Sequence, residues 1–148
     1  MSQYKLIAKN KKALFDYEVI ETLEVGIKLL GPEVKSLRQS KCNLKGSFCK
    51  FFKGELFLFD AHISRYLQMD RFSKLEEKRT RKLLLNSKEL DKWYGRVQKE
   101  KLVIVPLSIY FNEKGKVKLE VFLGKGKKLY DKRQDDKDKE AKKVTREW

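Results

Sequence analysis

Residues that bind metals, form disulfides or act as general bases are scarce in this chain of 148 residues. It has one histidine, His62, and two cysteines, Cys42 and Cys49, with no second cysteine pair or histidine cluster. This spacing gives no metal signature, and free thiols are expected rather than a disulfide. His62 has no neighbouring Asp and Ser pattern, which argues against general-base catalysis. The sequence therefore favours a protein that is not an enzyme and needs no metal or cofactor.

Long apolar runs are also missing. Residues 1–5 lead into no hydrophobic segment of signal-peptide length, and no window approaches the roughly 18 apolar residues of a membrane-spanning helix. We therefore expect a cytoplasmic protein without a membrane segment.

Negative charge is in short supply as well, because 21 Asp and Glu face 36 Lys and Arg, a formal net charge of +15. Residues 131–148 hold seven Lys or Arg and six Asp or Glu, a net of +1, so residues 1–130 carry the remaining +14. Such an excess repels itself in a compact body, and an anionic partner relieves the repulsion. Its place on the body favours a folded nucleic acid, with an anionic membrane surface as the second candidate.

The chain is rich in segments whose residues alternate between apolar and polar, the pattern of half-buried β-strands. Apolar residues alternate over residues 15–29, which predicts a long half-buried strand, bent where Glu21 interrupts the apolar face. Gly26 within it indicates a bulge or a close backbone approach. Residues 47–52 and 55–59 predict a hairpin around Lys53-Gly54. Its phenylalanines could form an RNA-stacking platform, but we expect most of them to belong to a core.

A second hairpin is predicted from residues 101–111 and 117–123, with Pro106 at an edge or bulge. Helices are expected after Gly31-Pro32, as a basic segment around residues 79–85, and after Ser87 as N-cap. In the last of these, Leu90, Tyr94 and Val97 define the apolar face, and Trp93 borders it.

The stretch Gly124–Arg133 joins this body to the tail. Two glycines let the backbone turn, five cations attract phosphate, and Tyr130 offers a ring for stacking. A solvated basic loop is the plain alternative. Overall the pattern predicts a mainly β domain at residues 1–130, an OB-like antiparallel closed β-barrel with three inserted helices. Residues 131–148 are expected to form a flexible tail, disordered when free and helical when docked.

Several segments, in order and at matching spacing, resemble the small protein B (SmpB) family of bacterial tmRNA-binding proteins. They are Ile7-Ala8 with Asn10-Lys11, Glu24 to Ile27, Glu33 to Arg38, Arg79 to Leu85, and Gly124 to Arg133. One departure is Glu76-Glu77, where members commonly have Asp-Pro.

The resemblance implies an OB-like barrel without catalytic activity that binds the tRNA-like domain of tmRNA. It also implies delivery of that RNA to ribosomes stalled on messages lacking a stop codon, which is trans-translation, with the tail in the empty mRNA channel. By motif match it places Asn10, Glu24 and Leu84 at the RNA. Neighbouring cations complete the expected RNA-binding set, namely Lys11, Lys125, Lys127 and Lys128. The resemblance further assigns a set of residues to the ribosomal decoding site: Tyr130, Asp131, Lys132 and Arg133.

Overall fold

The computed structural model describes residues 5–65 and 76–126, and its architecture is mainly β, as the strand patterns predict. The described part contains three helices and nine strands. In chain order they are β1 (Lys5–Lys9), α1 (Lys11–Asp16), β2 (Tyr17–Ile27), α2 (Gly31–Arg38), β3 (Cys42–Asn43), β4 (Phe48–Phe52), β5 (Glu55–Phe59), β6 (His62–Ile63), β7 (Arg81–Leu84), α4 (Ser87–Glu100), β8 (Val103–Phe111) and β9 (Val117–Gly126).

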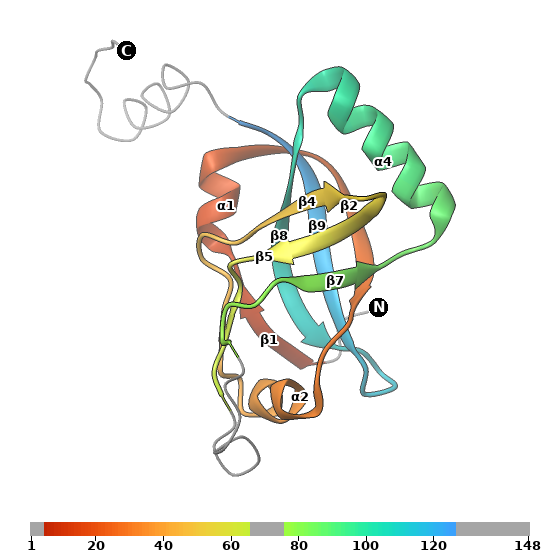
Figure 1. Cartoon of the computed structure of the whole chain (residues 1–148). Coiled ribbons are helices and arrows are strands. Elements are labelled where there is room, and N and C mark those ends of the chain that lie inside the picture. Colours follow the sequence, from red (N-terminus) through yellow and green to blue (C-terminus); the bar gives the residue numbers. More distant parts are fainter. Residues whose placement is uncertain (1–4, 66–75, 127–148) are drawn as a thin grey trace, which may run out of the picture.

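Seven of the strands form one antiparallel sheet in the order β1-β8-β4-β5-β7-β2-β9, and β8 pairs with β9 as well. In Figure 1, β4, β5 and β7 lie nearest the viewer, and β8 and β9 pass behind them. Neighbouring strands of this sheet differ greatly in the number of residues that they pair. Nine residue pairs join β2 to β9, whereas β4 meets β8 at the single pair Cys49 and Ile104. Strands β3 and β6 form a separate two-stranded sheet.

Both predicted hairpins are confirmed. In the β4–β5 turn, φ is 51° at Lys53 and 79° at Gly54, the two positive values that a tight hairpin turn requires. The β8–β9 turn is held by Asn112, whose side-chain oxygen accepts from the backbone N–H groups of Lys114 and Lys116. The register shifts just after Pro106, which confirms the expected bulge.

The long strand β2 has the predicted bend and close approach. Its register shifts between Val19 and Glu21, and the Glu21 carboxylate binds Lys92 and Arg96 of α4 at 3.3 and 3.2 Å. Glu21 therefore interrupts the apolar face because it ties α4 to the sheet. A Cβ on Gly26 would lie 3.3 Å from the Cβ of Leu84, so the close approach is confirmed.

Two predictions about where the helices lie were wrong. The basic segment expected to be helical is strand β7, because Arg81 and Leu83 are buried on one face while Lys82 and Leu84 occupy the other. The N-cap of α4 is Asn86, whose side chain accepts from the Glu89 N–H, rather than Ser87.

The buried centre of the α4 face is Trp93, with Leu90 and Val97 packed beside the core, and Tyr94 lies at the border. The strand predicted over residues 15–29 begins only at Tyr17, because Phe15 and Asp16 belong to α1. Gly124 and Gly126 do not turn the chain but extend β9 opposite Val19 and Tyr17.

Position 124 requires glycine because the Cβ of any other residue would lie only 2.8 Å from the Phe122 ring.

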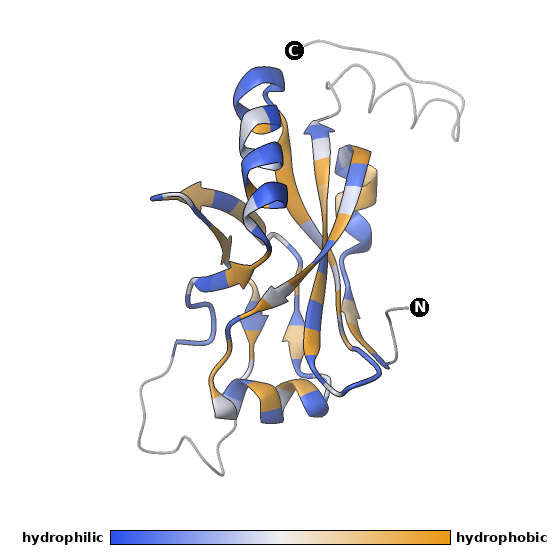
Figure 2. Ribbon diagram, turned by 90° about the vertical axis from the view of Figure 1, so that its right-hand side faces the viewer, coloured by the Kyte–Doolittle hydropathy of each residue, from blue (hydrophilic) through white to orange (hydrophobic). Residues whose placement is uncertain are grey.

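The phenylalanines of the β4–β5 hairpin also differ from expectation. The buried core residues of this hairpin are Cys49, Leu56 and Leu58, which alternate with phenylalanines along the two strands. Because side chains alternate across a strand, this places a second set on the opposite face, namely Phe48, Phe52, Phe57 and Phe59. Figure 2 shows this largely hydrophobic hairpin projecting at the left of the molecule.

A buried ion network joins α2 to β7. Arg81 is fully buried and Glu33 is 2% exposed, and the Arg81 guanidinium lies 2.7 Å from Glu33 Oε2. Arg79 Nη2 donates to Glu33 Oε1 at 2.7 Å, and the Leu30 N–H donates to the same carboxylate. Burial by itself would raise the pKa of Glu33, but these hydrogen bonds outweigh it and hold the pKa below its usual value. Arg81 also donates to the Ala61 carbonyl, so the network fixes the loop before β6.

Candidate nucleic-acid interface

Glu24, which the resemblance places at the RNA, projects from the outer face of β2. It is exposed and stands directly opposite Glu120 of β9. Like charges facing each other across strands repel, and each carboxylate here has a hydroxyl donor. Tyr110 donates its hydroxyl hydrogen to Glu24 Oε2, and Ser108 donates to Glu120 Oε1 at 3.3 Å. The Glu24 carboxylate is therefore held in a fixed orientation by a buried tyrosine.

Leu84 lies on the same outer face as Glu24. It pairs with Gly26, two residues along β2 from Glu24, and it is 48% exposed. Side chains at positions i and i+2 of a strand share one face. Since Gly26 has no side chain, the Leu84 side chain lies over the β2 backbone at this point. The structure thus brings together two predicted site residues that are 60 positions apart in the chain.

Asn10 occupies a different position from Glu24 and Leu84. Its side chain is buried, its Nδ2 donates to the Pro106 carbonyl at 3.1 Å, and its N–H donates to the Leu107 carbonyl. Asn10 thereby holds the β8 bulge, immediately before Ser108. Its neighbour Lys11 is exposed at the start of α1.

Lys125 is exposed near the end of β9, opposite Glu18 of β2. The other predicted residues of the junction lie outside the described residues, namely Lys127, Lys128, Tyr130, Asp131, Lys132 and Arg133. Strand β9 ends at Gly126, opposite Tyr17 at the start of β2.

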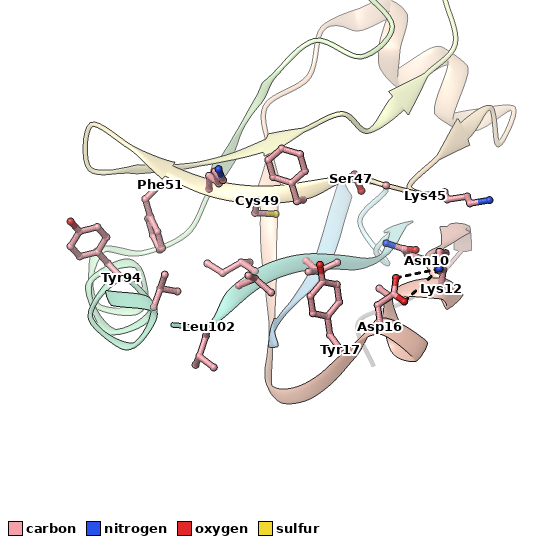
Figure 3. Close-up of a pocket in the computed structure, with 18 of the residues that line it drawn as sticks. Asn10, Lys12, Asp16, Tyr17, Lys45, Ser47, Cys49, Phe51, Tyr94 and Leu102 are labelled. Atoms are coloured by element: carbon pink, nitrogen blue, oxygen red, sulfur yellow. Dashed lines mark hydrogen bonds and ion pairs between the residues drawn. The ribbon is translucent and has the colours of Figure 1, made fainter. Parts of the chain in front are cut away.

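A groove of about 790 Å³ lies between α1 and α4, along the short joint between β4 and β8 (Figure 3). Phe51 and Tyr94 pack edge to face at one end, with ring centroids 5.1 Å apart. Tyr17 lies toward the other end, beside the ion pair of Lys12 and Asp16. The lining is mostly aromatic and apolar, with lysines at its margins. Such a lining suits the binding of a flat or apolar group better than catalysis.

The described residues offer little chemistry of other kinds. Across residues 5–65 and 76–126, no three His, Cys, Asp or Glu side chains gather to hold a metal ion. His62 Nε2 contacts Glu77 Oε1 at 3.0 Å, and Glu77 Oε2 accepts from the Arg65 N–H, so this pair anchors a loop. These hydrogen bonds lower the pKa of Glu77.

Both cysteines are free thiols. Burial raises the pKa of Cys42 to about 11 and raises that of Cys49 further, which suppresses the reactive thiolate. None of the helices in the described part of the chain is long and apolar enough to cross a bilayer.

The resemblance singles out Glu24 and Leu84, but the sequence did not reveal the residues that orient the Glu24 carboxylate. The alternation of β9 does place Glu120 on a polar face. However, only the register between β2 and β9 puts it opposite Glu24. Tyr110 gave no signal, because a tyrosine among apolar strand residues looks like a core residue.

Comparison with known proteins gives one consistent result. The family model described as "SmpB protein" matches residues 7–148. A protein named SsrA-binding protein from Helicobacter pylori (strain Shi470) is 56% identical over 135 residues, covering 91% of this chain and 89% of that protein. The protein of the same name from Helicobacter hepaticus is also 56% identical, over 91% of this chain and 87% of its own length.

A chain of a solved structure described as "tmRNA-SmpB: a journey to the center of the bacterial ribosome" is similar in three dimensions. It superposes with a TM-score of 0.67 at 44% sequence identity, covering 90% of this chain and 93% of its own.

Proposed function

This chain belongs to the SmpB protein family, and we propose that it binds the tRNA-like domain of tmRNA and brings it to stalled ribosomes for trans-translation. The observation that carries this proposal is the family match over residues 7–148 together with the 44% identical chain of the tmRNA-SmpB structure. The charge of +14 on residues 1–130 supports it, because a folded RNA is the polyanion such a body would recruit. In this proposal the protein is a cytoplasmic adaptor that catalyses no reaction.

The RNA would lie against the outer face of β2 and β7. The oriented Glu24 carboxylate accepts hydrogen bonds from base N–H groups or a ribose 2′-OH, which is recognition by pattern rather than by charge. Leu84 packs against a sugar or base beside it. A set of lysines attracts the phosphates around this face: Lys11, Lys125, Lys127 and Lys128. Asn10 acts indirectly, by fixing the β8 bulge that precedes Ser108 and Tyr110.

The segment after β9 would serve the ribosome. Tyr130 stacks in the decoding site, and Asp131, Lys132 and Arg133 form the base of a tail that enters the vacant mRNA channel.

We further propose that the sheet works as an OB-like closed barrel. The cycle of pairings from β8 through β4, β5, β7, β2 and β9 back to β8 supports this architecture.

Recovery of RNA from cells tests the proposed function. The tagged full-length chain is expressed in bacteria, and the RNA that copurifies is sequenced. We expect one long structured RNA, tmRNA, to be enriched over bulk tRNA. Equal recovery of all RNA, or displacement by a homopolymer as effective as tmRNA, would point instead to a general single-strand-binding module.

Replacing Glu24 with alanine should weaken binding of the tRNA-like domain about tenfold, as expected for a lost hydrogen bond to a charged acceptor. Tyr110→Phe should give a smaller loss, because the carboxylate remains but its orientation is freed. Glu113→Ala, in the β8–β9 turn, removes one carboxylate elsewhere and serves as the matched control. Filter binding or fluorescence anisotropy measures all three, and a Glu24→Ala variant with unchanged affinity would remove Glu24 from the interface.

Affinity for the same RNA should fall with added salt. If several lysines neutralise phosphates, raising monovalent salt from about 50 to about 200 mM should weaken binding at least tenfold. A plot of log affinity against log salt gives the number of phosphates neutralised, and a flat plot would contradict the electrostatic part of the proposal.

A further inference from the structure

The outer face of the β4–β5 hairpin carries aromatic rings and lysines together. Phe48 and Phe59 are cross-strand partners whose rings stack at 5.3 Å with an interplanar angle of 6°. Phe52 and Phe57 meet edge to face at 6.3 Å, and Phe52 is 58% exposed. A patch of four phenylalanines on one sheet face requires a partner more often than isolated apolar residues do. We call this set the phenylalanine platform.

Lysine ammonium groups lie over two of these rings. Lys50 Nζ is 5.7 Å from the centre of the Phe48 ring, and Lys53 Nζ is 5.4 Å from that of Phe52. Lys82 of β7 stands opposite Phe57 on the same face, where it faces Glu55 at 3.8 Å. The charged residues of this face are therefore three lysines and one glutamate, spaced among the rings.

From this arrangement we propose that the phenylalanine platform binds unpaired nucleotides of RNA. Bases stack on the phenylalanine rings. The lysine ammonium groups that otherwise lie over those rings move aside and form ion pairs with the phosphates. The exchange leaves both partners satisfied, because each lysine gains a phosphate while each ring gains a base. A protein partner fits this face less well, since protein interfaces are depleted of lysine. A second copy would bring together two bodies of the same strong positive charge.

The position of the platform supports the same occupant. Strand β7 connects it to the proposed RNA face, because Lys82 adjoins Phe57 on one side and Leu84 adjoins Gly26 on the other. Figure 1 shows β4, β5 and β7 side by side in the front layer. This inference rests on the proposed function, and it extends the RNA contact from β2 across β7 to the hairpin.

The test uses the full-length chain and two RNAs, the transcribed tRNA-like domain of tmRNA and a single-stranded oligouridylate. The double variant Phe52→Ser/Phe57→Ser should bind oligouridylate about tenfold more weakly, the loss expected from removing a stacked base. Phe52→Leu/Phe57→Leu keeps the apolar surface but removes the π faces, and it should show the same loss. Leu30→Ser, at a residue that is 47% exposed at the start of α2, is the control and should change nothing.

The outcomes separate this inference from the proposed function. If the unsubstituted protein fails to bind the tRNA-like domain, the proposed function is wrong. If it binds, and the folded serine variant keeps full affinity for both RNAs, the platform alone is overturned. Leucine variants with full affinity for RNA would overturn the stacking, because an apolar surface without aromatic rings would then suffice. A dimer of the unsubstituted protein that Phe52→Ser/Phe57→Ser dissociates would show that the face binds a second copy instead. Thermal melting confirms that each variant is folded.

Discussion

Replacing Glu33 with alanine is expected to lower the free energy of unfolding by about 3–5 kcal/mol, the usual cost of removing one partner from a buried ion pair. The loss is large because Arg81 is fully buried and would keep its charge with no carboxylate beside it. Arg79 and the Leu30 N–H would lose their acceptor at the same time. Urea unfolding of the variant and the unsubstituted protein measures the difference.

The pH dependence identifies the cause. Since the folded-state pKa of Glu33 lies below its ordinary value of 4.5, its contribution is complete above that value and disappears as the pH falls through the lower folded pKa. The stability difference between the two proteins should therefore shrink in acid. Arg79→Ala should cost less, because Arg79 is partly exposed. A Glu33→Ala variant as stable as the parent would mean that the network contributes nothing to the fold.

Deleting residues 134–148 is expected to abolish the tagging of incomplete proteins on stalled ribosomes while binding of the tRNA-like domain stays normal. The pairings described for the seven-stranded sheet join residues 5–65 and 76–126, so the shortened chain retains the strands of the proposed RNA face. The body also keeps its excess charge, because residues 131–148 contribute only +1. We propose that the deleted segment enters the mRNA channel. Without it, the delivered RNA would not be positioned for tagging.

Two measurements on the same preparation check this separation: affinity for the RNA, and tag addition to a reporter whose message lacks a stop codon. A chain whose last fifteen residues are scrambled, with composition and charge unchanged, tests whether order in the tail matters and should also fail to tag. Loss of RNA affinity in the truncated protein would contradict the proposed division between body and tail.

The elements that could be predicted from the sequence are those fixed by local patterns. Strand alternation and the turn residues Lys53-Gly54 and Asn112–Gly115 define two hairpins without reference to the rest of the chain. Pro106 and Gly26 mark the bulge and the close approach for local reasons as well. Proline has no N–H to give to the strand ladder, and glycine has no side chain to keep a neighbouring strand away. Glu24 and Leu84 were proposed as RNA-binding residues from a resemblance, and the structure places them on one face.

The errors arose where a distant residue decides the outcome. Arg81 suits a strand only because Glu33, 48 positions earlier, accepts its buried charge. A four-residue segment has no periodicity strong enough to reveal this. In the β4–β5 hairpin both faces are apolar, so the sequence could not tell that leucine and cysteine fill the core while four phenylalanines face outward. The resemblance places Asn10 at the RNA, yet its side chain is buried at the β8 bulge, where it donates to the Pro106 carbonyl.

The single pair that joins β4 to β8 has a mechanical consequence. A sheet opens most easily where the fewest hydrogen bonds must break, and that place lies along one side of the hairpin, while β5 remains attached to β7. We therefore expect the β4–β8 joint to open before the β2–β9 ladder, which nine residue pairs hold together. A ligand that contacts both the hairpin and β2 would therefore rest on one loosely joined part of the sheet and one extensively joined part.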